Sequence, residues 1–208
     1  MSKKRSSDAK SNLQKLSHER LDIGQMHNSL SAAKKGDDRT LAIVGGALID
    51  VALEQGLRHH LEKLGVVEEK MFAAFGVFST TASKIQIALA TGLVNKRAAS
   101  DLVWANDIRN AFAHSAPETT FDTPAIAAAC QELSLVSKQD LIDESAIFAE
   151  VATPDDREPG YTLIDRTGFI GFRGEFGNEA KAYDRFVGCL SILWFLLMSP
   201  QFGPLERQ

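Results

Sequence analysis

An arginine, an amide and a histidine lie close together near the end of one expected helix. Arg109, Asn110 and His114 fall within the stretch DIRNAFAH, residues 107–114. Arginine carries a permanent positive charge and a planar fork that matches phosphate oxygens, and histidine exchanges a proton near neutral pH. Such side chains suit RNA cleavage without a metal: histidine would move the proton of the 2′-hydroxyl, and arginine would stabilise the phosphorane. Arg109 and His114 are therefore the candidate catalytic pair.

Helix geometry separates these two side chains. Five residues turn an ideal helix through about 500°, which leaves Arg109 and His114 about 140° apart with a rise of about 7.5 Å. They share a face only if the helix frays before His114, which Pro117 favours; otherwise they act in different places. A single histidine also supplies only one of the two proton transfers, so two copies related by a two-fold axis would be needed for both.

Further polar residues are candidates to support this site. Asp50 is a lone carboxylate in a long apolar stretch, so it is expected either to pair with a buried arginine or to orient Arg109. Lys84 lies among apolar residues of another expected helix, where it is either ordinary surface or a positive neighbour of the site. Asp107 and Asn110 flank Arg109 within the motif and complete the set.

A purely structural interpretation of the motif stands beside the catalytic one. In it Arg109 pairs with Asp50 or Asp107, Asn110 caps a neighbouring segment, and His114 satisfies the helix end. Neither interpretation needs a metal ion or a cofactor, and we expect none. The sequence contains no glycine-rich phosphate loop of the known spacings.

The apolar periodicity predicts an all-α fold, a multi-helix bundle. A single helical domain is expected over residues 11–200, after a disordered basic tail at 1–10 and before a C-terminal tail at 201–208. Two short apolar pieces predict a small β-hairpin near residues 161–172. The expected helices cover residues 11–22, 25–35, 39–64, 82–91, 96–114, 124–135 and 179–198.

Two of these helices are unusually apolar. The helix over 39–64 carries apolar residues on more than one side, and Gly45 and Gly46 inside it predict a close helix crossing. Residues 186–198 are apolar nearly all round but shorter than the about 20 residues that a bilayer core requires. They are expected to be buried in the core or in a subunit interface, and no membrane association is predicted.

The charge and the cysteine content limit which partners and which cellular location we expect. The formal net charge of −4 argues against a broad nucleic-acid-binding surface, because phosphate binding needs a positive face. Cys130 and Cys189 are not part of a CxxC pair, and both are expected to be buried, reduced thiols. No secretory signal follows the polar N-terminus. We therefore expect a cytoplasmic protein.

Short segments in a fixed order resemble the mannitol operon repressor family. They span roughly residues 37–135, and the resemblance implies an all-helical fold and a role in transcriptional repression. Because that family lacks an obvious DNA-binding domain, the implied partner is a protein such as a transcription factor. The segments are DR at 38–39, AIVGGALID at 42–50, SKI at 83–85, ALATGL at 88–93, DIRNAFAHS at 107–115 and FD at 121–122.

The spacing of Arg109 and His114 is also similar to the HEPN superfamily. Many members of that superfamily are metal-independent ribonucleases whose site forms across a dimer of helical domains. This resemblance implies a homodimer and an alternative function, in which Arg109 and His114 cleave RNA. RNA is a partner in that alternative alone.

Overall fold

The computed structural model describes residues 21, 23–73, 75–136, 148–149, 162–164, 169–171 and 181–198. The expected tails at 1–10 and 201–208 lie outside these residues, as does the expected helix at 11–22 apart from Leu21.

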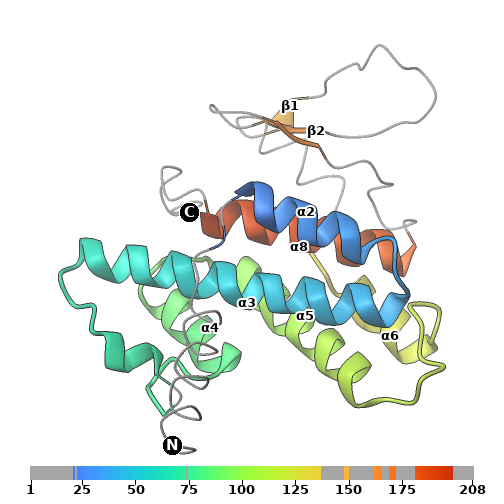
Figure 1. The fold of residues 1–208 in the computed structure, drawn as a ribbon, viewed down its shortest axis with the longest axis horizontal. Coiled ribbons are helices and arrows are strands. Elements are labelled where there is room, and N and C mark those ends of the chain that lie inside the picture. Colours follow the sequence, from blue (N-terminus) through green and yellow to red (C-terminus); the bar gives the residue numbers. More distant parts are fainter. Residues whose placement is uncertain are drawn as a thin grey trace, which may run out of the picture.

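Helix α3 (Asp38–Lys63) is the central helix of the bundle (Figure 1). It packs against four other helices, and the shorter α6 packs against α5 and α8. The all-α multi-helix bundle predicted from the periodicity is confirmed for the described part of the chain. The remaining helices are α2 (Ile23–Ala33), the 3-10 helix η1 (Glu69–Phe72), α4 (Thr81–Ala90), α5 (Lys96–His114), α6 (Pro124–Gln131) and α8 (Ala182–Met198).

Three short strands form an antiparallel sheet in the order β1-β2-β3. They are β1 (Phe148–Ala149), β2 (Thr162–Ile164) and β3 (Phe169–Gly171). Leu163 is paired with Ile170, so β2 and β3 lie where the hairpin near residues 161–172 was expected.

Two adjacent glycines let α3 approach its neighbours closely. A Cβ atom added to Gly45 would lie 2.5 Å from Cδ1 of Leu190 in α8, and one added to Gly46 would lie 2.8 Å from Cβ of Arg109 in α5. Real Cβ contacts are not that short, so any larger residue would force a shift. The expected close helix crossing is therefore confirmed, and it fixes where the stem of Arg109 lies.

Local signals set the ends of α3, α4 and α5. The side chain of Asn95 accepts a hydrogen bond from the backbone N–H of Ala98 at 2.8 Å, which caps the first turn of α5. Gly65 and Gly92 follow α3 and α4 with φ values of +71° and +75°, a backbone region that glycine tolerates best. These caps position α5 and its motif against α3.

The apolar last helix, α8, lies in the core of its own chain. Most of its residues from Ala182 to Leu197 are buried, and Trp194 donates a hydrogen bond to Sδ of Met26 at 2.8 Å. Cys130 and Cys189 are both buried and free, as expected. Of the two settings predicted for residues 186–198, the structure shows the core.

Helix α3 is long and apolar enough to cross a membrane if length and composition alone are considered. Its packing against α2, α4, α5 and α8 is instead that of a core helix.

Candidate functional site

Helix α5 is unbroken through its polar motif. It extends to His114, and the backbone N–H of Ser115 still bonds the carbonyl of Ala111 at 2.9 Å. The helix does not fray before His114, so Arg109 and His114 stay about 140° apart around its axis. A single chain therefore does not bring the two side chains to one face.

Arg109 is half-buried beside α3, with its stem over Gly46. Its Nη1 donates to Oδ1 of Asn110 at 2.8 Å. In the described part of the chain it makes no hydrogen bond or ion pair with a carboxylate, so the predicted pairing with Asp50 or Asp107 is wrong. Asn110 likewise accepts from its neighbour and does not cap another segment. Most of the five guanidinium donors thus have no acceptor among the residues that the structure describes.

The end of α5 is held by an arginine from another helix. The guanidinium of Arg39 in α3 donates to the carbonyls of Phe112, Ser115 and Ala116, at 3.2 Å for Ser115. The first is a carbonyl of the last turn of α5 and the other two belong to the residues that follow the helix, so none of them has an intrahelical N–H partner. The expectation that His114 satisfies the helix end is therefore wrong. His114 is exposed and, among the described residues, makes no hydrogen bond or ion pair.

The residue before Arg39 fixes the turn that follows α5. Asp38 Oδ2 accepts from the backbone N–H of Phe121 at 2.8 Å. The Phe121 ring lies 4.9 Å from the Phe112 ring and 5.6 Å from the Tyr183 ring. Burial, and then the charges of Asp184 and Asp38, raise the pKa of Tyr183. The start of α3 therefore clamps the end of α5.

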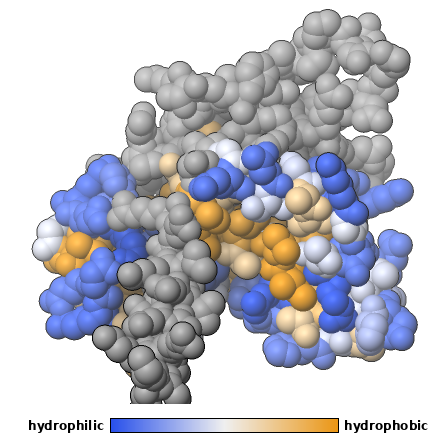
Figure 2. All heavy atoms as spheres, viewed as in Figure 1, coloured by the Kyte–Doolittle hydropathy of each residue, from blue (hydrophilic) through white to orange (hydrophobic). Residues whose placement is uncertain are grey.

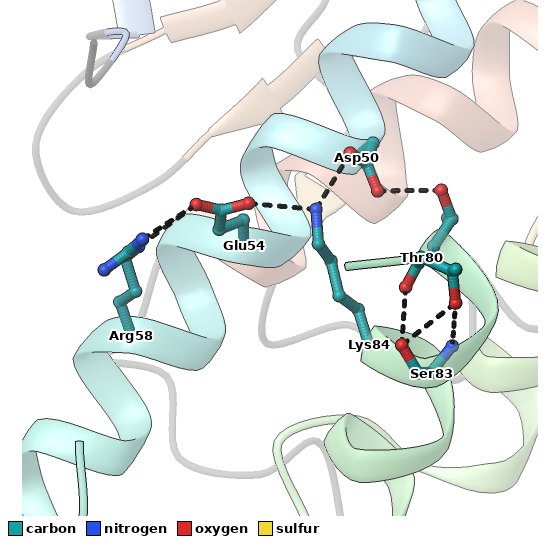
Figure 3. A network of polar contacts seen from close by, with 7 residues as sticks. Asp50, Glu54, Arg58, Thr80, Ser83 and Lys84 are labelled. Carbon is teal, nitrogen blue, oxygen red and sulfur yellow. Dashed lines mark hydrogen bonds and ion pairs between the residues drawn. The ribbon is translucent and has the colours of Figure 1, made fainter. Parts of the chain in front are cut away.

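Asp50 and Lys84 bind each other and not Arg109 (Figure 3). Lys84 Nζ lies 2.9 Å from Asp50 Oδ2 and 2.9 Å from Glu54 Oε2, and Thr81 Oγ1 donates to Asp50 Oδ1 at 2.8 Å. Lys84 is 4% exposed. Lys84 is therefore not an ordinary surface residue, and it does not bond Arg109. The prediction of an arginine as the partner of Asp50 is wrong, because a lysine from α4 takes that place.

The ion pairs continue along α3 toward its C-terminus. Arg58 Nε donates to Glu54 Oε1 at 3.1 Å, and Arg58 Nη1 lies 3.0 Å from Glu69 Oε1. The same guanidinium lies 3.8 Å above the Phe72 ring. Burial raises the pKa of Glu54, but the hydrogen bond and charge of Lys84, with those of Arg58, bring it below its ordinary value. These ion pairs connect α4 and η1 to α3.

Sequence reasoning missed a second polar cluster, which lies on the buried side of α5. Asp101 is fully buried, and its two oxygens accept from four groups. The donors are the backbone N–H of Ser134 at 3.0 Å, its hydroxyl at 2.9 Å, the backbone N–H of Leu135 at 2.8 Å and the Cys189 thiol at 3.5 Å. Asp101 thus holds the segment after α6 against α5.

Arg185 of α8 also binds the segment at the end of α6. It is 3% exposed, and its guanidinium donates to the carbonyls of Cys130 at 2.9 Å and Leu133 at 2.6 Å, where α6 ends. A signal was available in the sequence: Asp101 lies four and seven residues before the buried Ala105 and Ile108, so it is a charge on the core stripe. A lone charge among apolar residues singled out Asp50, and the same criterion would have singled out Asp101.

The thiols near this cluster are unreactive by environment. Burial raises the pKa of Cys130 to about 12 although the charge of Arg185 opposes it. Burial and the nearby Asp101 carboxylate also raise the pKa of Cys189. Nucleophilic chemistry needs a thiolate, so neither cysteine suits catalysis.

No family model matches this chain, and its comparison with curated proteins and with solved structures gave no match. In the ranges that the structure describes, no three His, Cys, Asp or Glu side chains gather as metal ligands would.

Proposed function

We propose that this chain is a repressor-type transcriptional regulator of the mannitol operon repressor family. It acts in the cytoplasm, as a homodimer, through a protein partner such as a transcription factor. The observation that carries the proposal is that most of the segments with the family resemblance contact one another between α3, α4 and α5.

Five of the six segments contribute such a contact. Asp38 and Arg39 hold the end of the DIRNAFAHS segment and the turn after it. Gly46 of the AIVGGALID segment receives the stem of Arg109. Asp50 of the same segment binds Lys84 of the SKI segment. The residues that carry the resemblance are thus also the residues that assemble one physical unit.

That unit leaves a few polar side chains to solvent. Arg109 and Asn110 are half-buried and, within the described ranges, bond only each other, and His114 is exposed. Arginine is enriched among the residues that dominate binding energy at protein interfaces. The net charge of −4 disfavours an extended phosphate-binding surface, which supports a protein as the direct partner. We assign Arg109 to the recognition of that partner.

Affinity capture from cells tests this proposal. A tagged wild-type chain and the Lys96→Ala variant, which lacks another basic side chain of α5, are expected to recover the same transcription factor. Arg109→Ala, shown to be folded by circular dichroism, is expected to lose it. Recovery of neither a transcription factor nor operator DNA by the wild type would reject the regulatory role.

One observation supports a second candidate function, a metal-independent ribonuclease of HEPN type. Because Arg39 satisfies the end of α5, His114 remains exposed and chemically available. Since one chain holds Arg109 and His114 on different sides of α5, this activity would require two copies.

Incubation with single-stranded RNA in EDTA separates the candidates. Cleavage that leaves cyclic phosphate ends, disappears in His114→Ala and persists in His59→Ala would favour the enzyme, because His59 is an exposed histidine elsewhere. Intact RNA at high protein concentration would exclude it.

A further inference from the structure

The central helix α3 keeps an apolar stripe toward solvent. Ile43, Ala47 and Val51 recur at four-residue steps and therefore lie along one side of the helix. Ala47 is exposed, Ile43 and Val51 are half-buried, and none of the three belongs to the hydrophobic core or to the residues packed against it. Figure 2 shows apolar side chains gathered in the middle of the view, where α3 runs in Figure 1. The stripe is thus apolar surface that the described helices do not cover.

A row of hydrogen-bonding side chains from α5 borders this stripe. The stem of Arg109 lies over Gly46, the residue before Ala47. Asn106 and Asn110 are four residues apart and therefore lie along one side of α5, with Arg109 beside them. The three side chains of this row are all half-buried. One face of the molecule thus combines an apolar stripe from α3 with a polar row from α5.

Bonds within the chain do not explain the polar row. Arg109 Nη1 donates to Asn110 Oδ1 at 2.8 Å, and Asn106 makes no hydrogen bond with any described residue. Asparagine is a poorer helix former than alanine, because its side chain competes for backbone groups. Asn106 and Asn110 therefore weaken α5 without binding another described helix. Their amides remain available to groups from outside the chain.

The charge of Arg109 indicates what one of those outside groups is. Among the described residues no carboxylate binds it, since Asp50 is bound to Lys84 and Asp107 lies about 160° away around α5. A guanidinium taken partly out of water is stabilised most by a carboxylate, which it can bind through two parallel hydrogen bonds. The face therefore lacks one acidic group.

The charge of the whole chain limits how acidic the occupant of this face is. The formal net charge of −4 repels both a run of acidic residues and a nucleic acid. A single carboxylate among apolar side chains avoids most of that repulsion, and the apolar side chains match the stripe of Ile43, Ala47 and Val51. A protein segment of this composition therefore complements the face better than a polyanion does.

We infer that the protein partner docks on this face through an apolar segment that contains one aspartate or glutamate. The carboxylate of the segment binds Arg109, and its apolar side chains cover the stripe on α3. The amide of Asn106 carries both donors and an acceptor, so it bonds the backbone of the segment. The inference rests on the proposed function, because it specifies what the partner presents to Arg109.

Selection from a random library of displayed peptides tests the inference, with the full chain as the bait. Peptides are selected on the wild type and depleted on Ala47→Gln, which places a polar side chain on the stripe. The peptides that remain are expected to carry an aspartate or glutamate among apolar residues. Retained peptides without an acidic residue, or a selection that retains no peptide, overturn the inference.

A second alanine provides the matched control for the stripe. Ala47 and Ala111 are both exposed helical alanines, but Ala111 lies about 200° around α5 from Arg109. Ala111→Gln is expected to bind the retained peptides as the wild type does, and both variants should keep the wild-type circular dichroism spectrum. Loss of the peptides in Ala111→Gln would place their binding site elsewhere and overturn the inference.

A double-mutant cycle with one synthetic retained peptide assigns its acidic residue to Arg109. Replacement of that residue by its amide should weaken binding to the wild type by at least about tenfold, because close charge pairs at interfaces are strongly coupled. The same replacement should leave binding to Arg109→Gln unchanged, whereas Lys96→Ala should respond as the wild type does. Fluorescence anisotropy measures the affinities. Equal losses in the wild type and Arg109→Gln overturn the inference.

The outcomes separate this inference from the proposed function. Acidic peptides that require Arg109, with capture of neither a transcription factor nor operator DNA, keep the docking chemistry and remove the regulatory role. A transcription factor that Arg109→Ala no longer captures, with retained peptides that lack an acidic residue, keeps the role and removes the inference. If no peptide is retained and single-stranded RNA binds the wild type but not Arg109→Gln, Arg109 binds phosphate and the inference fails.

Discussion

Helix α5 carries two polar clusters that differ in how completely they are bonded. In its first half, Asp101 is fully buried and accepts from four donors. In its last two turns, Arg109 and Asn110 bond only each other as far as the described part of the chain goes, and His114 is exposed. One helix thus carries a saturated cluster on its buried side and an unsaturated one at its end.

The degree of saturation indicates which cluster serves the fold. A buried donor or acceptor that loses its partner costs about 1–3 kcal/mol, so a saturated buried cluster is explained by stability alone. A half-exposed group that loses its partner costs less free energy, because water can replace that partner. The polar side chains of Arg109, Asn110 and His114 are therefore the part of α5 that folding explains least, and we assign them to function.

The largest effect on stability is expected from Asp101→Ala. The change leaves the half-buried backbone and hydroxyl donors of Ser134 and Leu135 without an acceptor, which should lower the free energy of unfolding by about 3 kcal/mol. Urea denaturation followed by circular dichroism measures it. Asp107→Ala, at an exposed position of the same helix, is the control and should stay within about 0.5 kcal/mol of the wild type. Equal effects would erase the distinction between the clusters.

The second-largest effect on stability is expected from replacing Arg39, which holds the end of α5. Arg39→Ala leaves the carbonyls of Phe112, Ser115 and Ala116 without their donor, and we expect a loss of about 1–3 kcal/mol. Hydrogen exchange at residues 112–116 should accelerate more than exchange in the middle of α5. Unchanged exchange there would show that the clamp does not hold the end of the helix.

The paired glycines should respond unequally to alanine. At Gly46 the added Cβ meets Cβ of Arg109, which cannot rotate away, so Gly46→Ala should destabilise by about 1–3 kcal/mol. At Gly45 it meets the flexible end of Leu190, and the gain in helix propensity of about 1 kcal/mol should largely offset the contact. Thermal denaturation of the two variants measures the difference. A Gly45→Ala variant that is less stable than Gly46→Ala would contradict the crossing geometry.

Acid should weaken the row of ion pairs on α3. The folded-state pKa of Glu54 lies below its ordinary value of 4.5, so the stabilisation is present above pH 4.5 and is lost as the pH falls through the lowered pKa. Glu54→Gln should therefore show a flatter decline of stability below pH 4.5 than the wild type. Parallel curves from urea titrations at several pH values would contradict this role of Glu54.

The smallest effect is expected at the motif. Because His114 makes no bond in the described region, His114→Ala should change the free energy of unfolding by no more than about 0.5 kcal/mol. The same urea titration measures it. A loss comparable to that of Asp101→Ala would mean that His114 serves the fold after all.

Apolar periodicity and end signals were enough to predict the bundle. The bounds of α5 agree with the expectation, because Asn95 and Pro117 mark its two ends in the sequence. Gly45 and Gly46 likewise predicted a close crossing. Such features depend on local chemistry, which a single sequence displays directly.

Side-chain partners were predicted less well, because they depend on how helices are aligned in space. The sequence marked Asp50 as a charge in need of a partner, yet the partner could have come from any neighbouring helix, and it is Lys84. The end of α5 is held by Arg39, a residue 73 positions before Phe112. Periodicity contains no information about that alignment.

The central claim is that Arg109 serves a partner and not the fold. Affinity capture with wild type and Arg109→Ala, normalised to equally folded protein, tests it most directly. We predict that Arg109→Ala unfolds within about 1 kcal/mol of the wild type and loses the captured transcription factor. Undiminished capture by Arg109→Ala would contradict the claim, and so would a loss of stability as large as that of Asp101→Ala.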